Sequence, residues 1–167
     1  MPATYEPIAT TTLGSDANSV TFSTISGSYT DLIAVVSPAS TSVQDQYIRF
    51  NSDTGSNYSY TILSGTGSSA VSSRQSSQTF GTGDYYGAPS TTLGETTTIW
   101  QFMNYSNTTT YKTAIVRSNK ASGGVDAIVN LWRSTAAITS ITFYAYVSGT
   151  TNYKTGSTFT LYGIKAA

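Results

Sequence analysis

Apolar and polar side chains alternate with a period of two along most of this 167-residue chain. Such alternation is typical of β-strands that bury one face, because successive side chains of a strand point to opposite sides. We expect the apolar members of each run to face the core. These members are Val20 and Phe22; Ile48 and Phe50; Tyr58, Tyr60 and Ile62; Val125, Ala127, Val129 and Leu131; Ile141, Phe143, Ala145 and Val147; and Phe159 and Leu161.

Turn signals separate these runs, and no stretch carries a convincing helical stripe. Gly-rich segments such as residues 26–28 and 122–124 mark the turns. The continuous apolar run at residues 32–36 predicts a strand that is buried on both sides. Many short strands with Gly-rich turns predict an all-β fold, an antiparallel β-sandwich, and most simply a jelly roll of eight to ten strands.

Two segments depart from the alternation. Residues 68–94 contain few apolar side chains, so we expect a long loop with one polar edge strand near residues 76–80. At the N-terminus, residues 1–13 precede the first clear strand. The sequence therefore predicts a docking arm over residues 1–13 and a single β-sandwich domain over residues 14–167.

The composition argues against catalysis. The chain has no His and no Cys, and Glu occurs only at Glu6 and Glu95, so the commonest general base, thiol chemistry and the commonest metal ligands are missing. We expect no enzymatic activity, no catalytic residues, no cofactor and no metal. The balance of eight basic and eight acidic residues gives no field that would attract nucleic acid, and no segment has the length of a membrane span.

Residues 51–57 place oxygen-bearing side chains at alternate positions around Gly55, which resembles a calcium loop. The acidic side chains are few and no Glu closes the loop. The alternative is a tight connection between two strands, in which Asp53 bonds its own backbone.

Tyrosines offer the best binding hypothesis. Tyr144 and Tyr146 have the opposite parity to Phe143, and Tyr162 has the opposite parity to Leu161. If these two strands are neighbours, the three tyrosines share one outer face. That face could join subunits, stack on sugar rings, or simply be solvated. Tyr85 and Tyr86, in a Gly-rich loop, and Trp132, as either core or lid, complete the candidate interface or glycan-binding residues.

Several phrases together resemble a known family. They are SVTFSTI at residues 19–25 with YTDL at 29–32, RFNSDTGSNYS at 49–59, LWRSTAAITSIT at 131–142, and GSTFTLYGIK at 156–165. The chain resembles small virion proteins of tailed bacteriophages, of the cyanophage type, which are described as structural, tail-fibre-like or head-decoration proteins. This resemblance implies a virion location and other capsid or tail proteins as partners.

We therefore expect a structural virion protein of the capsid decoration or cement type, assembled as a homo-oligomer with a trimer as the first candidate. The absence of a stalk or coiled coil favours the head over a fibre tip. The alternative is a tail-fibre or tail-tip adhesin that binds host surface glycan through loops 81–90 and 118–124. A polysaccharide depolymerase would need clustered acids, which the sequence does not suggest.

Overall fold

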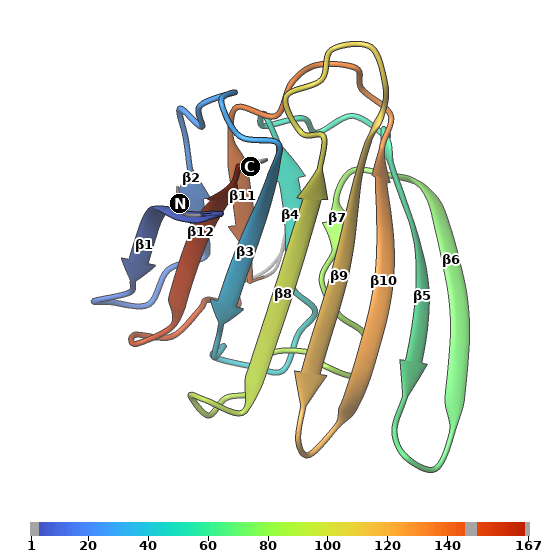
Figure 1. The fold of residues 1–167 in the computed structure, drawn as a ribbon. Helices are drawn as coiled ribbons and strands as arrows, with labels where there is room; N and C mark the ends of the chain where they lie inside the picture. Colours follow the sequence, from blue (N-terminus) through green and yellow to red (C-terminus); the bar gives the residue numbers. More distant parts are fainter. Residues whose placement is uncertain (1–3, 146–149, 166–167) are drawn as a thin grey trace.

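A computed structural model describes residues 4–145 and 150–165. It contains two antiparallel sheets packed as a sandwich (Figure 1). The large sheet has the order β1 (Tyr5–Thr12), β12 (Thr158–Ile164), β3 (Asp31–Ser37), β8 (Thr96–Met103), β9 (Lys112–Lys120), β10 (Gly124–Trp132), β5 (Tyr58–Gly65), β6 (Ala70–Gln78). The small sheet has the order β2 (Ser19–Phe22), β11 (Ile141–Tyr144), β4 (Tyr47–Phe50), β7 (Gly81–Thr82).

The chain passes repeatedly between the two sheets, which is the jelly-roll type of connection. Strands β1 to β5 alternate between the large and the small sheet, and β11 and β12 do so again. The predicted all-β antiparallel sandwich is confirmed. The described residues form twelve strands rather than eight to ten, mainly because short strands such as β7 carry too little pattern to be recognised.

The core between the sheets is aromatic. The side chains of Trp100, Phe50, Phe102, Phe143 and Phe159 are all at most 2% exposed. Phe50 contacts Phe102 edge-on, with ring centroids 5.7 Å apart, and Phe143 contacts both Trp100 and Phe159 at 5.8 Å. The predicted inward faces of β2, β4, β11 and β12 are confirmed.

Strand β3 is buried differently from its prediction. Leu32, Ala34 and Val36 are fully buried, whereas Ile33 and Val35 are half-buried on the outer face of the large sheet. The run is apolar throughout because its outer side chains lie among neighbours on both adjacent strands, not because a second layer covers them.

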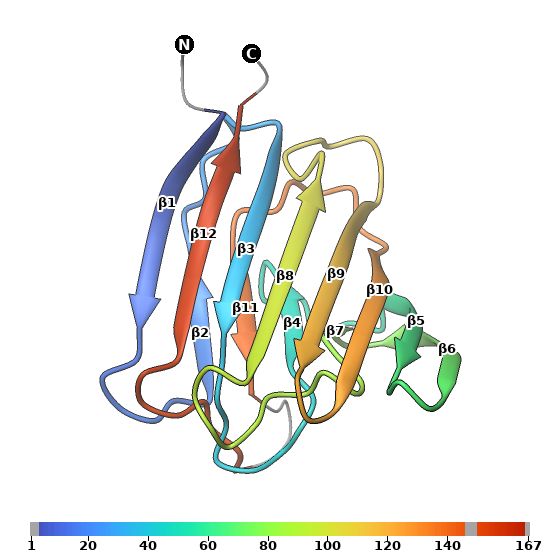
Figure 2. The ribbon, with the colours of Figure 1, turned by 60° about the horizontal axis from the view of Figure 1, so that its bottom comes forward.

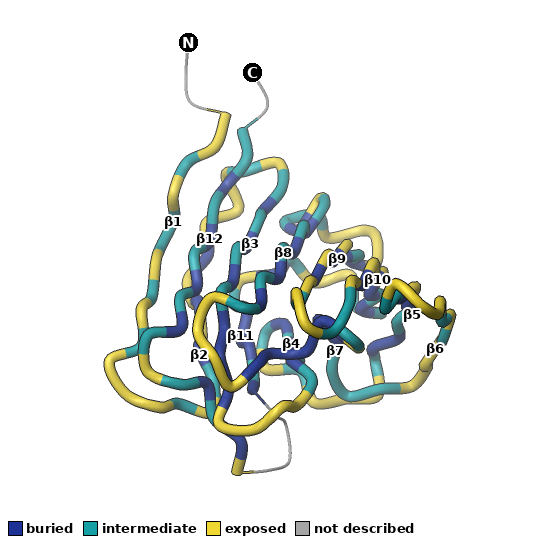
Figure 3. Tube along the Cα trace, turned by 90° about the horizontal axis from the view of Figure 1, so that it is seen from below, coloured by how far each residue is buried: buried dark blue, intermediate teal, exposed yellow. Residues whose placement is uncertain are grey.

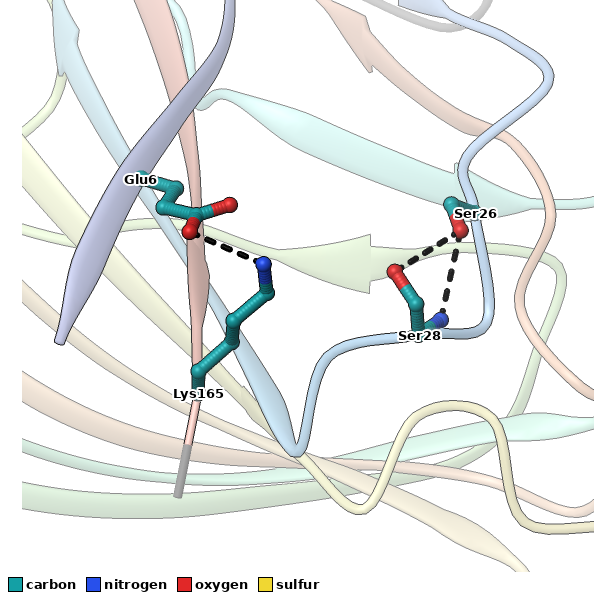
Figure 4. A network of polar contacts seen from close by, with 4 residues as sticks. All are labelled: Glu6, Ser26, Ser28 and Lys165. Atoms are coloured by element: carbon teal, nitrogen blue, oxygen red, sulfur yellow. Dashed lines mark hydrogen bonds and ion pairs between the residues drawn. The ribbon is translucent and has the colours of Figure 1, made fainter. Parts of the chain in front are cut away.

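Residues 5–12, within the segment expected as a docking arm, are an edge strand. Strand β1 pairs with β12 along its length, with a bulge between Pro7 and Ala9. Lys165 closes this edge (Figure 4): its Nζ lies 2.8 Å from Oε1 of Glu6 and 5.6 Å from the centre of the Tyr29 ring. The segment is thus part of the large sheet from Tyr5 onward, and its docking role stays a prediction.

Two segments far apart in the sequence form a polar joint at one end of the sandwich. Residues 51–57 connect β4 to β5, and residues 133–140 connect β10 to β11, so both cross between the sheets. The side chain of Asn51 donates to the carbonyl of Ala137 (2.7 Å) and accepts from the amides of Thr139 (2.8 Å) and Ser140 (3.0 Å). Figure 1 shows both connections at the same end of the sandwich, above β4 and β11, and Figure 2 shows β2, β11 and β4 behind the large sheet.

Asp53 organises the same joint. Its carboxylate accepts from the Gly55 amide (2.8 Å), from Nδ2 of Asn57 (2.9 Å) and from the indole Nε1 of Trp132 (2.7 Å). These donors hold the pKa of Asp53 below its ordinary value against the opposing effect of burial. Residues 51–57 therefore make a structural connection, as in the turn alternative, and Asp53 bonds internally with both oxygens.

Both edges of the large sheet are open. The side chains of β1 and β6 are exposed or half-buried along their whole length, as Figure 3 shows by colour. Strand β6 confirms the polar edge strand expected within residues 68–94, although it begins at Ala70 rather than near residue 76. No helix in the described residues is long and apolar enough to cross a membrane.

Candidate binding surface

Strand β10 reverses the usual distribution of polarity. The sequence predicted that Val125, Ala127, Val129 and Leu131 face the core, and this prediction is wrong. Val125, Ala127 and Val129 are exposed and Leu131 is half-buried, while the alternate residues Asp126, Ile128, Asn130 and Trp132 are buried. The strand thus presents its more apolar face to the outside.

The polar side chains face inward because the backbone of residues 81–87 covers this part of the inner face. Asn130 accepts from the Thr82 amide and donates to the Thr82 carbonyl, both at 2.9 Å. Asp126 accepts from the amides of Tyr85 (2.8 Å), Tyr86 (3.1 Å) and Gly87 (2.7 Å), and from the hydroxyl of Ser118 (2.8 Å). A loop that replaces a strand needs such partners for its buried amides.

Two buried carboxyls in this region have opposite shifts. Burial raises the pKa of Asp126, but the hydrogen bonds from the loop amides and Ser118 outweigh it and hold the pKa below its ordinary value. For Asp84, burial and the neighbouring Asp45 raise the pKa well above its ordinary value, although the Gln46 amide donates to both of its oxygens at 3.1–3.2 Å. Asp126 is therefore a charged anchor for the loop, whereas burial opposes the ionisation of Asp84.

The outward residues of β10 join neighbours on β9 and β5 in an aliphatic patch, which consists of Leu63, Ile115, Val125, Ala127 and Val129. Ala127 lies opposite Leu63, and Val129 lies opposite Ile115. Leu63 and Val125 are each 59% exposed, Val129 is 48% exposed and Ile115 is 38% exposed. A cluster of large aliphatic side chains this exposed marks an interaction surface.

The patch is hollowed at one end, over the small side chain of Ala127. A depression of about 500 Å³ is bounded by Leu63, Val125, Arg117 and Asn119. A second depression of about 380 Å³ shares Val125 and Asn119 with it and extends to Thr66 and Lys120, at the tips of the β5–β6 and β9–β10 hairpins. The two depressions adjoin each other at Val125 and Asn119.

Tyr144 and Tyr162 do not share one outer face, because their strands are not neighbours. Strand β11 lies in the small sheet and β12 in the large sheet, so Tyr144 and Tyr162 are on opposite outer faces of the sandwich. Tyr144 packs beneath the guanidinium of Arg49, 5.4 Å from its ring centre. Tyr162 lies opposite Ile33 on the large sheet, in the row that continues through Ile115 to Val129. Tyr146 lies outside the described residues.

The other candidate aromatics divide between surface and core. Tyr85 is 44% exposed and contacts the half-buried Tyr86 edge-on, with ring centroids 4.8 Å apart. Trp132 is 2% exposed and packs against Phe50 and Tyr58, so it is core and has no face available to a ligand. Trp132 has the parity of Asp126 and Asn130, so the reversed orientation of β10 is what places it in the core.

The described residues contain no group of three or more carboxylate, His or Cys side chains that could hold a metal ion. Each of the eight carboxyls accepts at least one hydrogen bond from within the chain, and the donors serve turns, loop amides or the β1 edge. The hydrogen bonds to these carboxyl groups therefore stabilise the fold.

No family model and no curated protein matches the sequence. Among solved structures, the chain is similar to the Caenorhabditis elegans galectin LEC-6, at 9% sequence identity and a TM-score of 0.38, over 94% of this chain and 96% of the galectin. A likeness at this level carries no inference about ligand or activity.

Proposed function

We propose that the chain is a non-enzymatic structural subunit of a bacteriophage virion, a decoration-type sandwich that assembles on the particle as a homo-oligomer and docks there through the aliphatic patch. The observation that carries the proposal is the reversed polarity of β10, whose exposed residues are aliphatic and whose buried residues include Asp126 and Asn130. Leaving such side chains in water is unfavourable, at about 25 cal/mol per Å² of apolar surface, so a partner that covers them would be bound tightly.

The weakly charged surface supports the same proposal. Only 10% of residues are charged and the net charge is zero, and neutral surfaces associate readily. The resemblance of residues 19–32, 49–59, 131–142 and 156–165 to tailed-phage virion proteins supports the particle as the place of assembly.

The test compares two variants on particles of the phage that encodes the chain. Val125→Thr with Val129→Thr makes the patch polar while keeping the side-chain shape. Val43→Thr makes the same change at another exposed position, where Val43 is 53% exposed. We expect wild type and V43T to be incorporated, and the patch variant to be folded but absent from particles. Absence of the wild-type chain from purified particles, or normal incorporation of the patch variant, would contradict the proposal.

The second candidate, a tail adhesin that binds host glycan, is supported by the position of two loops. Residues 81–90 and 118–124 lie together. Gly123 is so close to the Tyr86 carbonyl oxygen, and Gly124 to the Tyr86 Cβ, that an added side chain at either glycine would meet that atom. Tyr85 is exposed beside them. A glycan array would distinguish this candidate. Specific binding that is lost in Tyr85→Ala but kept in Tyr111→Ala, a more exposed tyrosine elsewhere, would favour the adhesin.

A further inference from the structure

The acidic and basic side chains of this protein differ in how many of them form hydrogen bonds within the chain. All eight acidic side chains accept hydrogen bonds within the chain. Five of the eight basic side chains also donate internally, namely Arg49, Lys112, Arg133, Lys154 and Lys165. Arg74, Arg117 and Lys120 make no hydrogen bond or ion pair with another described residue. Although the net charge is zero, these three cationic side chains therefore have no partner among the described residues.

Arg117 and Arg74 lie on the same outer face as the aliphatic patch, and Lys120 lies at the end of the β9–β10 hairpin beside it. Arg117 lies directly opposite Ala127 and bounds the larger depression. Lys120 lines the second depression. Arg74, on β6, lies opposite Thr61 of β5. It is two residues along β6 from Ser72, which lies opposite Leu63, so the side chains of Arg74 and Ser72 point to the same face of the sheet. With strands about 4.8 Å apart, Arg117 and Arg74 flank the patch across three strand intervals, a separation of roughly 15 Å.

No acidic side chain of β5, β6, β9 or β10 points outward in the described structure. Asp126, the one carboxylate on these strands, is 4% exposed and bonded to the loop on the inner face. Two copies meeting patch to patch would bring cations together with nothing to neutralise them. An apolar centre with cations around it instead complements a protein surface that has an apolar centre and carboxylates around it.

We propose that the partner of the aliphatic patch is a different protein, with an acidic rim around an apolar contact, and not a second copy of this chain. The inference rests on the proposed function, in which the patch docks on the particle. The apolar centre supplies affinity, while Arg117, Lys120 and Arg74 supply orientation and speed of association.

The experiment measures uptake of purified protein by particles that lack it, at 50 and 500 mM NaCl. Arg117→Gln with Lys120→Gln removes two of the cations. Lys154→Gln is the control, because it removes a half-buried cation elsewhere that donates to the Thr91 carbonyl. We expect the double variant to bind about tenfold more weakly at low salt and the control to resemble wild type. High salt should weaken wild type strongly and the double variant, which keeps Arg74, much less. Poly-L-glutamate should compete with uptake, and poly-L-lysine should not.

Three outcomes would overturn the inference. In the first outcome, V125T/V129T loses uptake while the Arg117→Gln/Lys120→Gln variant is taken up fully and independently of salt. This result would leave the proposed function standing and exclude an acidic partner. Self-association in sedimentation velocity that V125T/V129T abolishes would assign the patch to a second copy. Binding of an acidic glycan that Arg117→Gln abolishes would make the partner a saccharide. If particles do not take up the wild type at all, the proposed function itself fails.

Discussion

Asp126 accepts hydrogen bonds from three consecutive backbone amides of the loop, those of residues 85–87. Its Oδ2 accepts from the amides of Tyr85 and Gly87 and from the Ser118 hydroxyl, while Oδ1 accepts from Tyr86. Asp126→Ala removes every acceptor and leaves three loop amides without a partner, at about 1–3 kcal/mol for each that stays buried. Because the loop can relax, we expect a loss of about 4 kcal/mol in the free energy of unfolding.

Asp126→Asn tests the same geometry more gently. An amide oxygen in the position of Oδ2 keeps three of the four hydrogen bonds, while the amide nitrogen faces the Tyr86 N–H. We expect a loss of about 2 kcal/mol, from one lost bond and the lost charge. Urea unfolding followed by the fluorescence of the buried Trp100 and Trp132 measures both values. With a slope of about 2 kcal/mol per M, the midpoints should fall by about 2 M for Ala and 1 M for Asn.

The pH dependence gives an independent check. Since the folded pKa of Asp126 lies below that of the unfolded chain, its contribution is present above about pH 4 and is lost as the pH falls through the folded value. The Asn variant should lose this part of the acid destabilisation. Asp16→Asn is the control, because Asp16 accepts from Thr155 at an exposed turn, and it should cost less than about 1 kcal/mol. Equal effects of D126N and D16N would refute the anchoring role.

Two further predictions concern the same region. The folded pKa of Asp84 is raised, so its ionisation destabilises the fold. Stability should therefore rise as the pH falls through the folded pKa towards about 4, the value of the unfolded chain. Asp84→Asn should reduce this rise, and an unchanged stability profile in urea melts from about pH 4 to 8 would contradict the burial argument. A Cβ on Gly124 would overlap the carbonyl oxygen of Gly65, so Gly124→Ala should lower the free energy of unfolding by about 2 kcal/mol. The control, Gly14→Ala, has open space around it and should change the thermal midpoint little. Equal midpoints of the two variants would show that β5 and β10 can separate without cost.

The alternation in the sequence predicted the sandwich because most strands bury one apolar face, as β4 and β12 do. It failed on β10 because both faces of that strand contain apolar residues, and the period alone does not say which face is inside. The answer depends on residues 81–87, whose backbone needs Asp126 and Asn130 as partners. Nothing local to β10 reveals that requirement.

The candidate surface was missed for the same reason. Val125 and Val129 were assigned to the core, so their exposure could not be expected. The tyrosine face failed on topology, because β11 and β12 are consecutive in the sequence but lie in different sheets. Strand order depends on long-range pairing, which a single sequence does not encode in its pattern. By contrast, the phrases at residues 49–59 and 131–142 prove to be mutual neighbours in the polar joint.

The polar joint also has a consequence for how the chain folds. Asn51 and Ala137 are 86 residues apart, so the intervening chain must lose the entropy of a long loop before the joint stabilises anything. Sandwiches dominated by such distant pairings fold in milliseconds to seconds. Until the joint closes, the hairpin of β9 and β10 can form locally with its valines already on the outside. Closure of the joint should therefore be a late step of folding, after the local hairpin has formed.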